Sequence, residues 1–114
     1  MEVQEIASRI KEMKTVCLSG TPAMMRSRTD FIDMLTGFGI SASISISKRT
    51  GVLIVCEQPN ERKLRQAEIV GVPILNESQW FELTPELEAQ GMWTGKTVCA
   101  DENGIYRVVV DGDG

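Results

Sequence analysis

A run of four apolar residues, three of them β-branched, most narrowly limits how this chain can fold. Val52-Leu53-Ile54-Val55 follows a polar turn and has no interrupting polar residue. A short continuous run of this kind is typical of a strand that is covered on both faces, as in the centre of a parallel sheet. Such a sheet needs helices on both of its faces. The sequence therefore predicts an α/β layer fold.

The segments around this run alternate between strand and helix patterns. We expect strands at 15–18, 40–46, 52–55 and 72–75, and helices at 2–13, from Ser27 or Thr29 to Thr36, at 61–70 and at 77–83. The predicted fold is a four-stranded, mostly parallel sheet flanked by three helices, with an additional N-terminal helix and a C-terminal hairpin. We divide the chain into an amphipathic helix (1–13), a main domain (14–84) and an acidic extension with the hairpin (85–114).

Composition excludes several classes of function. The three cysteines have no paired spacing, which favours a reducing, cytoplasmic location. The chain has no histidine, the usual general base and commonest metal ligand, so we expect no enzyme activity, metal or cofactor. We expect no signal peptide and no membrane partner, because no apolar run approaches membrane-spanning length.

Charge is unevenly distributed along the chain. The net charge is −4, but residues 14–82 carry eight Lys or Arg against seven Asp or Glu, whereas residues 83–114 carry two against six. The whole molecule therefore exerts no long-range attraction on DNA, while its middle leaves room for a local basic cluster.

One pair of residues has the sequence spacing of an enzyme motif. Cys56 and Arg62 match the Cys-x5-Arg pattern of phosphatases that use a cysteine nucleophile. A loop that wraps a phosphate dianion with backbone N–H groups needs glycines and no carboxylates. Here Glu57 and Glu61 would repel the phosphate and Pro59 removes a donor, so we reject this function.

Six stretches, in order and spacing over about 70 residues, resemble a BRCT domain of the sort found in bacterial NAD-dependent DNA ligases and in the large subunit of clamp loaders. They are Val16-Cys17-Leu18-Ser19-Gly20, Gly39, Ser43 to Thr50, Leu53-Ile54-Val55, Lys63 to Ala67 and Gly71 to Leu75, with Trp80 at the position of a core aromatic. The sequence departs from the family at Ile40, where a second glycine is usual, and at Gly51, where an acidic residue often stands. Its loop before Arg28 is one residue longer than in the ligases.

The resemblance implies a phosphate site of Ser19, Gly20, Lys63 and Arg28, with Arg26 replacing Arg28 if the longer loop shifts the register. Thr21 is a further candidate. A phosphate needs converging donors, at least one of them cationic, and the carboxyl edge of parallel strands is where ligands bind in such sheets. The alternatives remain open: Ser19-Gly20 as a plain tight turn, and Lys63 and Arg28 as solvated surface residues.

The family implies a non-catalytic binding module of DNA repair or replication. Its ligand would be a phosphorylated DNA end or a phosphorylated protein segment, and its partner a DNA ligase or a replication protein. The alternative is a docking or dimerisation domain that needs no phosphate. The acidic net charge favours that second function. Residues 2–13 resemble, in position only, a helix that binders of 5′-phosphorylated DNA ends require; packing on the sheet or on a parent protein is the alternative role.

Overall fold

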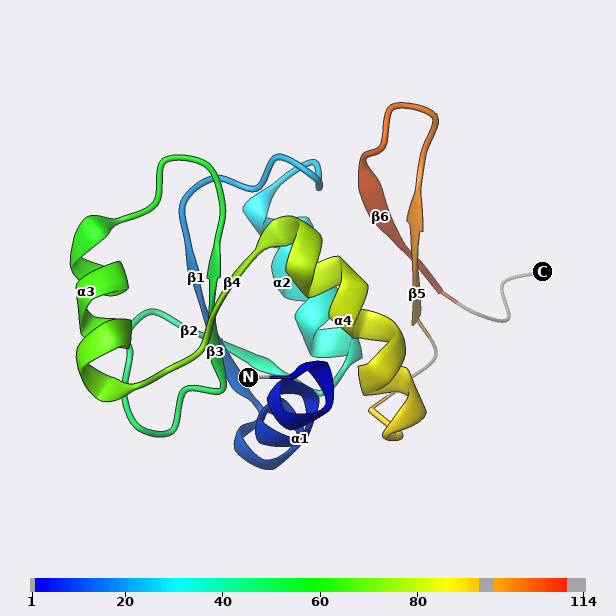
Figure 1. The fold of residues 1–114 in the computed structure, drawn as a ribbon. Helices are drawn as coiled ribbons and strands as arrows, with labels where there is room; N and C mark the ends of the chain where they lie inside the picture. The colour runs from blue at the N-terminus through cyan, green and yellow to red at the C-terminus, as the bar shows by residue number, and fades with distance from the viewer. Residues whose placement is uncertain (1, 93–95, 111–114) are drawn as a thin grey trace.

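A computed structural model describes residues 2–92 and 96–110 of the chain. The helices are α1 (Val3–Met13), α2 (Arg28–Gly37), α3 (Glu61–Val70) and α4 (Glu77–Ala89), and the strands are β1 (Thr15–Ser19), β2 (Ser41–Ser43), β3 (Val52–Val55), β4 (Ile74–Asn76), β5 (Lys96–Ala100) and β6 (Tyr106–Val110). The first four strands form a parallel sheet in the order β2-β1-β3-β4, and β5 and β6 form an antiparallel hairpin (Figure 1). The predicted fold class is confirmed.

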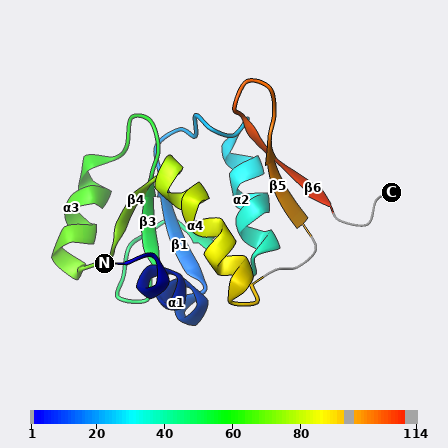
Figure 2. The same ribbon diagram turned by 45° about the vertical axis from the view of Figure 1, so that its right-hand side comes forward.

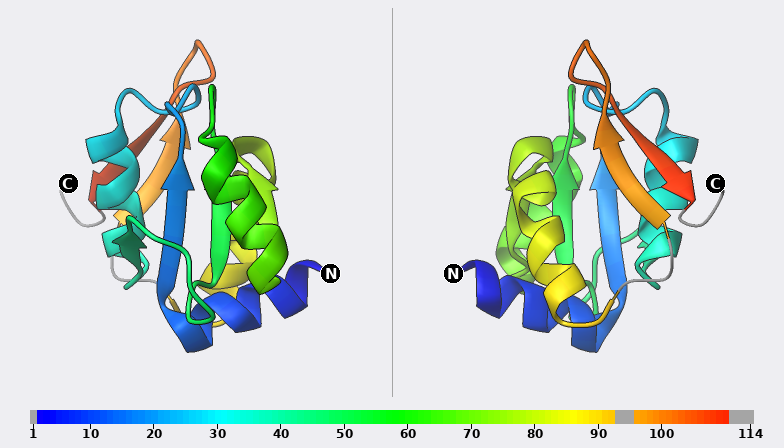
Figure 3. Two further views of the ribbon diagram at one scale, coloured as in Figure 1. Left: turned by 90° about the vertical axis from the view of Figure 1, so that its left-hand side faces the viewer. Right: turned by 90° about the vertical axis from the view of Figure 1, so that its right-hand side faces the viewer.

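Helices cover both faces of the sheet. In Figure 1, α3 lies on one face and α2 and α4 lie on the other, while α1 crosses below the amino ends of the strands. The two views of Figure 3 show the same arrangement from the sides. Val52, Leu53 and Ile54 of β3 are fully buried, as the continuous apolar run predicts for a central strand.

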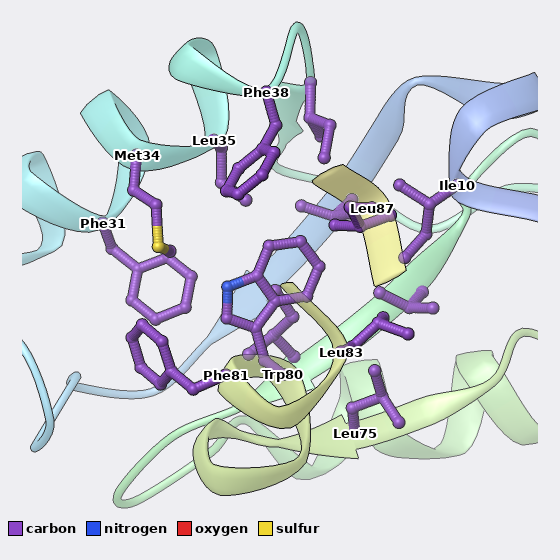
Figure 4. Close-up of a cluster of buried hydrophobic side chains, with 14 of the residues drawn as sticks. Ile10, Phe31, Met34, Leu35, Phe38, Leu75, Trp80, Phe81, Leu83 and Leu87 are labelled. Atoms are coloured by element: carbon purple, nitrogen blue, oxygen red, sulfur yellow. The ribbon is translucent and has the colours of Figure 1, made fainter. Parts of the chain in front are cut away.

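Trp80 occupies the centre of the larger core, between the sheet and helices α2 and α4 (Figure 4). Its ring centroid lies 6.4 Å from that of Phe31 and 6.5 Å from that of Phe38, which it meets edge-on. The indole Nε1 has no hydrogen-bond partner among the described residues. Trp80 therefore acts as a packing residue, and its predicted place in the core is confirmed.

Under α3, the core is much smaller. Its fully enclosed members are Cys17, Ile46, Leu53, Ala67 and Val72. Ala67 is the buried residue of α3, whereas Leu64 and Val70 are only partly buried. Because little apolar area anchors α3, its position depends on contacts at its two ends as well as on packing.

The amphipathic helix predicted at the N-terminus is confirmed as α1. Ile6, Ala7 and Ile10 are buried. Its Arg9 donates to three backbone carbonyls of the turn before β3, namely those of Gly51 (2.9 Å), Thr50 (3.0 Å) and Lys48 (3.4 Å). Charge-assisted bonds of this kind fix the helix to the amino end of the sheet.

The strand predicted at 40–46 is wrong in length, because β2 ends at Ser43. The Ser43 hydroxyl donates to the Ser45 carbonyl (2.7 Å) and accepts from the Ser45 N–H (3.2 Å), which offers the backbone a local turn in place of a ladder. Ser45 and Ser47 therefore lie in a loop beyond the end of β2.

Two other boundaries also differ from prediction. The fourth strand is Ile74–Asn76 instead of 72–75, and α4 continues past Leu83 to Ala89 with Pro85 inside it. Proline cannot donate to the carbonyl four residues earlier, which belongs to Phe81. The Thr84 hydroxyl donates to that carbonyl instead (2.9 Å), so the helix survives the proline.

The predicted hairpin forms and packs on the outer side of α2 (Figure 2). At the start of β6, Tyr106 stacks on Phe81 of α4 with a centroid distance of 3.8 Å and an interplanar angle of 7°. None of the helices in the described ranges is both long and apolar enough to cross a membrane.

Candidate functional site

Two loops meet at the carboxyl edge of the sheet. They are 20–27, between β1 and α2, and 56–60, between β3 and α3, and they lie side by side above the strands in Figure 1. The Thr21 N–H donates to the Glu57 carbonyl (2.8 Å), and the Glu57 N–H donates to the Thr21 carbonyl (3.0 Å). The sheet thus ends in a fixed pair of loops, at the edge where the sequence predicts the site.

Gly20 is at the point of closest approach between these loops. Its φ is +94°, and a Cβ atom placed on it would lie 2.4 Å from the Glu57 carbonyl oxygen. No other residue type fits this conformation and this space without movement of the backbone. The Gly20 N–H donates to no protein acceptor in the described ranges, so it remains available to a ligand.

Ser19 places its hydroxyl at the start of α3. The side chain is buried, and its Oγ accepts a hydrogen bond from the Asn60 N–H at 2.8 Å. Asn60 in turn caps α3, because its side chain accepts from the Arg62 N–H at 2.9 Å. Since the Ser19 oxygen acts as acceptor toward Asn60, its own proton is left to donate.

The two predicted cations come from helix starts on opposite faces of the sheet. Arg28 is the first residue of α2, which Ser27 caps by accepting from the Asp30 N–H. The Arg28 Nη2 donates to the Leu18 carbonyl at 3.3 Å, so its guanidinium reaches back over the end of β1. Lys63 lies in the first turn of α3 and is partly buried.

Both predicted cations lie within electrostatic reach of the Cys17 thiol. Burial raises the pKa of Cys17, while the positive charges of Lys63 and Arg28 both oppose that rise. Charges act on a thiol in this way only when they lie near it. Cys17 precedes Ser19 by two residues on β1, and the Arg28 bond to the Leu18 carbonyl places that guanidinium beside the end of this strand. Neither cation has an ion-pair partner among the residues described.

The side chains of Arg26 and Thr21 form no hydrogen bond at this strand end in the described part of the chain. The Arg26 side chain is exposed. Its charge is also absent from the groups that act on Cys17 and Cys56. Thr21 contributes its backbone to the loop pair, and its side chain is exposed. Of the two arginines, Arg28 is therefore the one that reaches the strand end despite the longer loop.

A buried carboxylate that the sequence did not reveal stands behind the loop. Glu77, the first residue of α4, accepts from the Ala23 N–H (2.8 Å) and the Met24 N–H (2.9 Å). Burial, with the charge of Glu77 and a hydrogen bond to it, raises the pKa of Cys56 to about 12. A thiol with this pKa stays protonated and is a poor nucleophile, which agrees with rejecting the phosphatase function.

The cluster presents a hydroxyl, a free N–H, a guanidinium and an ammonium as donors, while the carboxylates of Glu57 and Glu61 lie exposed on the adjacent loop and at the first residue of α3. These donors suit a small anion, and the helix terminus adds partial positive charge. Within the described residues, no group of three or more Cys, Asp or Glu side chains is arranged to hold a metal ion.

Comparison with known proteins relates the chain to DNA ligases. It is 35% identical over 82 residues to a DNA ligase of Helicobacter pylori strain P12, and 35% identical over 82 residues to one of Persephonella marina. A DNA ligase of Campylobacter fetus is 32% identical over 83 residues. These stretches are 72–73% of this chain but only 11–12% of the ligases. No protein-family model matches the chain. The chain is therefore homologous to a short segment of DNA ligases.

Proposed function

We propose that this chain is a BRCT-type binding module without catalytic activity, and that it holds the terminal phosphate of a DNA end. The observation that carries this proposal is that the Ser19 hydroxyl, the Arg28 guanidinium and a free Gly20 N–H lie at the end of β1, with Lys63 in the first turn of the adjoining α3. A terminal phosphate is a compact anion with several acceptor oxygens, and each of these groups can donate to it. The similarity to a segment of DNA ligases supports DNA as the ligand in this proposal.

Binding through this site alone is modest in strength. A hydrogen bond to a charged group contributes about 1.5–3 kcal/mol, and the net charge of −4 repels the rest of the DNA. The module is therefore expected to act beside other DNA contacts, and its affinity is expected to fall as salt is raised.

The test compares a duplex carrying a 5′-phosphate with the same duplex lacking it, at low salt. We expect saturable binding of the phosphorylated duplex and much weaker binding of the other. Lys63→Glu should weaken binding of the phosphorylated duplex by about 10-fold or more, because it removes a charged donor and adds repulsion. Lys48→Glu is the matched control, since Lys48 is exposed in the turn at the opposite end of the sheet.

A further comparison measures binding of a phosphoserine peptide and of the same peptide without the phosphate. A preference for the phosphopeptide over the DNA end would refute DNA as the ligand and keep the phosphate site. Equal binding of all phosphorylated and unphosphorylated probes, or binding of none, would refute the phosphate function.

A second function, docking of a protein without phosphate, is favoured by two exposed isoleucines. Ile44 and Ile69 are each 84% exposed and are the most exposed large apolar side chains of the described residues. Were the chain to dimerise through them, sedimentation would show a concentration-dependent increase in mass that Ile69→Asp abolishes. Monomeric behaviour at all concentrations would exclude dimerisation.

A further inference from the structure

We propose that Glu77 and Tyr106 are positioning residues that clamp the loop 20–27 from two sides, and that the β5–β6 hairpin is thereby part of the phosphate-binding unit. The role toward phosphate rests on the proposed function. The clamp itself is a statement about the loop and is tested without any ligand.

Glu77 forms the inner half of the clamp. It is only 7% exposed, and its two oxygens accept from consecutive N–H groups, those of Ala23 and Met24. Its charge and a hydrogen bond also act on the Cys56 thiol at the end of β3. One carboxylate thus connects the start of α4, the loop 20–27 and the segment after β3. A buried carboxylate is stable only with such donors, so the loop and Glu77 depend on each other.

Tyr106 forms the outer half. Its N–H donates to the Met24 carbonyl, and Tyr106 pairs with Met25 in a parallel bridge. Its ring stacks on Phe81, four residues beyond Glu77 on α4. The N–H of Met24 is therefore held by α4 and its carbonyl by the hairpin. The side chain of Met25 is buried in the core, so the loop is also anchored by packing at this residue.

The clamped loop determines where Arg28 lies. The loop runs from Gly20 at the strand end to Ser27, the cap of α2, and Arg28 follows directly. The Nη2 bond to the Leu18 carbonyl, 3.3 Å long, requires that α2 start at this place. Freedom in the loop would let the guanidinium leave the strand end, although Arg28 itself is unchanged.

Amide hydrogen exchange of the full chain tests the clamp directly. Glu77→Gln keeps the shape but turns an amide NH₂ toward one of the two N–H donors. We expect protection of at least one of the Ala23 and Met24 amides to fall by about tenfold or more, because that donor is left without its acceptor. Glu82→Gln makes the same chemical change at an exposed position of α4 and should leave both amides unchanged.

The ring of Tyr106 is tested by a pair of variants. Tyr106→Ala removes the stack on Phe81 and should speed exchange of the residue 106 amide, which donates to the Met24 carbonyl, whereas Tyr106→Phe keeps the stack and should restore wild-type exchange. Circular dichroism and thermal unfolding show that each variant is folded. Unchanged exchange in folded Glu77→Gln and Tyr106→Ala would overturn the clamp.

Binding of the 5′-phosphorylated duplex tests the role toward phosphate. We expect Glu77→Gln and Tyr106→Ala to bind about tenfold more weakly, with the guanidinium NMR signal of Arg28 shifted toward that of a free arginine side chain. Faster loop exchange with unchanged binding would overturn the positioning role. If the wild-type chain binds no phosphorylated probe, the proposed function fails, and the exchange rates still decide the clamp.

Discussion

Replacement of Gly20 by alanine tests whether the loops 20–27 and 56–60 are fixed against each other at the edge of the sheet where the candidate site lies. An alanine at φ +94° costs about 1–2 kcal/mol as a left-handed residue. Its Cβ would also lie 2.4 Å from the Glu57 carbonyl oxygen, so the Glu57 peptide has to move. That movement weakens the two hydrogen bonds between Thr21 and Glu57, which contribute about 0.5–1.5 kcal/mol each. The expected loss of unfolding free energy is therefore about 2–5 kcal/mol.

Gly39→Ala is the matched control for this prediction. Gly39 has φ +75°, but nothing lies within 4 Å of a Cβ placed on it, so its replacement carries the conformational cost alone. Urea unfolding of the two variants, compared at equal m-values, measures the difference directly. A larger loss for Gly20→Ala, by about 1–3 kcal/mol, is expected from the close approach. Equal losses would show that the loops are not fixed against each other.

Three further predictions follow from the described contacts. Trp80→Ala should cost about 3–5 kcal/mol in unfolding free energy, and Trp80→Phe clearly less, because the indole N–H has no partner to lose; equal costs would contradict this. The Cys56 pKa rises from 9.0 to about 12 on folding, so the protonated thiol stabilises the folded state fully below pH 9, and this stabilisation is lost as pH rises toward 12. In Cys56→Ala, the unfolding free energy measured by chemical denaturation should therefore fall less steeply over this alkaline range. Arg9→Ala should speed amide exchange in the turn 47–51, and unchanged exchange would exclude its bonds to the carbonyls of that turn.

Much of the fold could be predicted because the deciding signals are local. The apolar run at 52–55 identifies the central strand, and Asn60 marks the start of α3, where its side chain caps the helix. Both signals depend on neighbours in the sequence, and both are confirmed. The hairpin is also encoded locally, in the turn Asp101-Glu102-Asn103-Gly104 between its two strands.

The errors arose where one side chain changes the bonding of the backbone. Thr84 satisfies the carbonyl that Pro85 leaves unpaired, so α4 does not end where the proline suggests. Ser43 bonds to the backbone of Ser45 and shortens β2, although the alternating pattern continues to Ile46. Periodicity describes which faces are apolar, but it does not report these individual bonds.

For the candidate site, the resemblance predicts a set of residues but says nothing of the framework that holds them. Ser19, Gly20, Arg28 and Lys63 are identified by their place in the resemblance. Glu77 looks like an ordinary acidic residue in the first turn of a helix, where such residues are common. Its burial depends on a loop more than 50 residues earlier, and no local pattern encodes that contact.

An NMR titration of the ¹⁵N-labelled chain with a 5′-phosphorylated duplex most directly examines whether the end of β1 receives a phosphate. We expect saturable shifts of the Gly20 amide and the Arg28 guanidinium, absent with the unphosphorylated duplex. Identical shifts with both duplexes, or shifts centred on Ile44 and Ile69 with none at Gly20, would show that the chain does not recognise phosphate at this edge of the sheet.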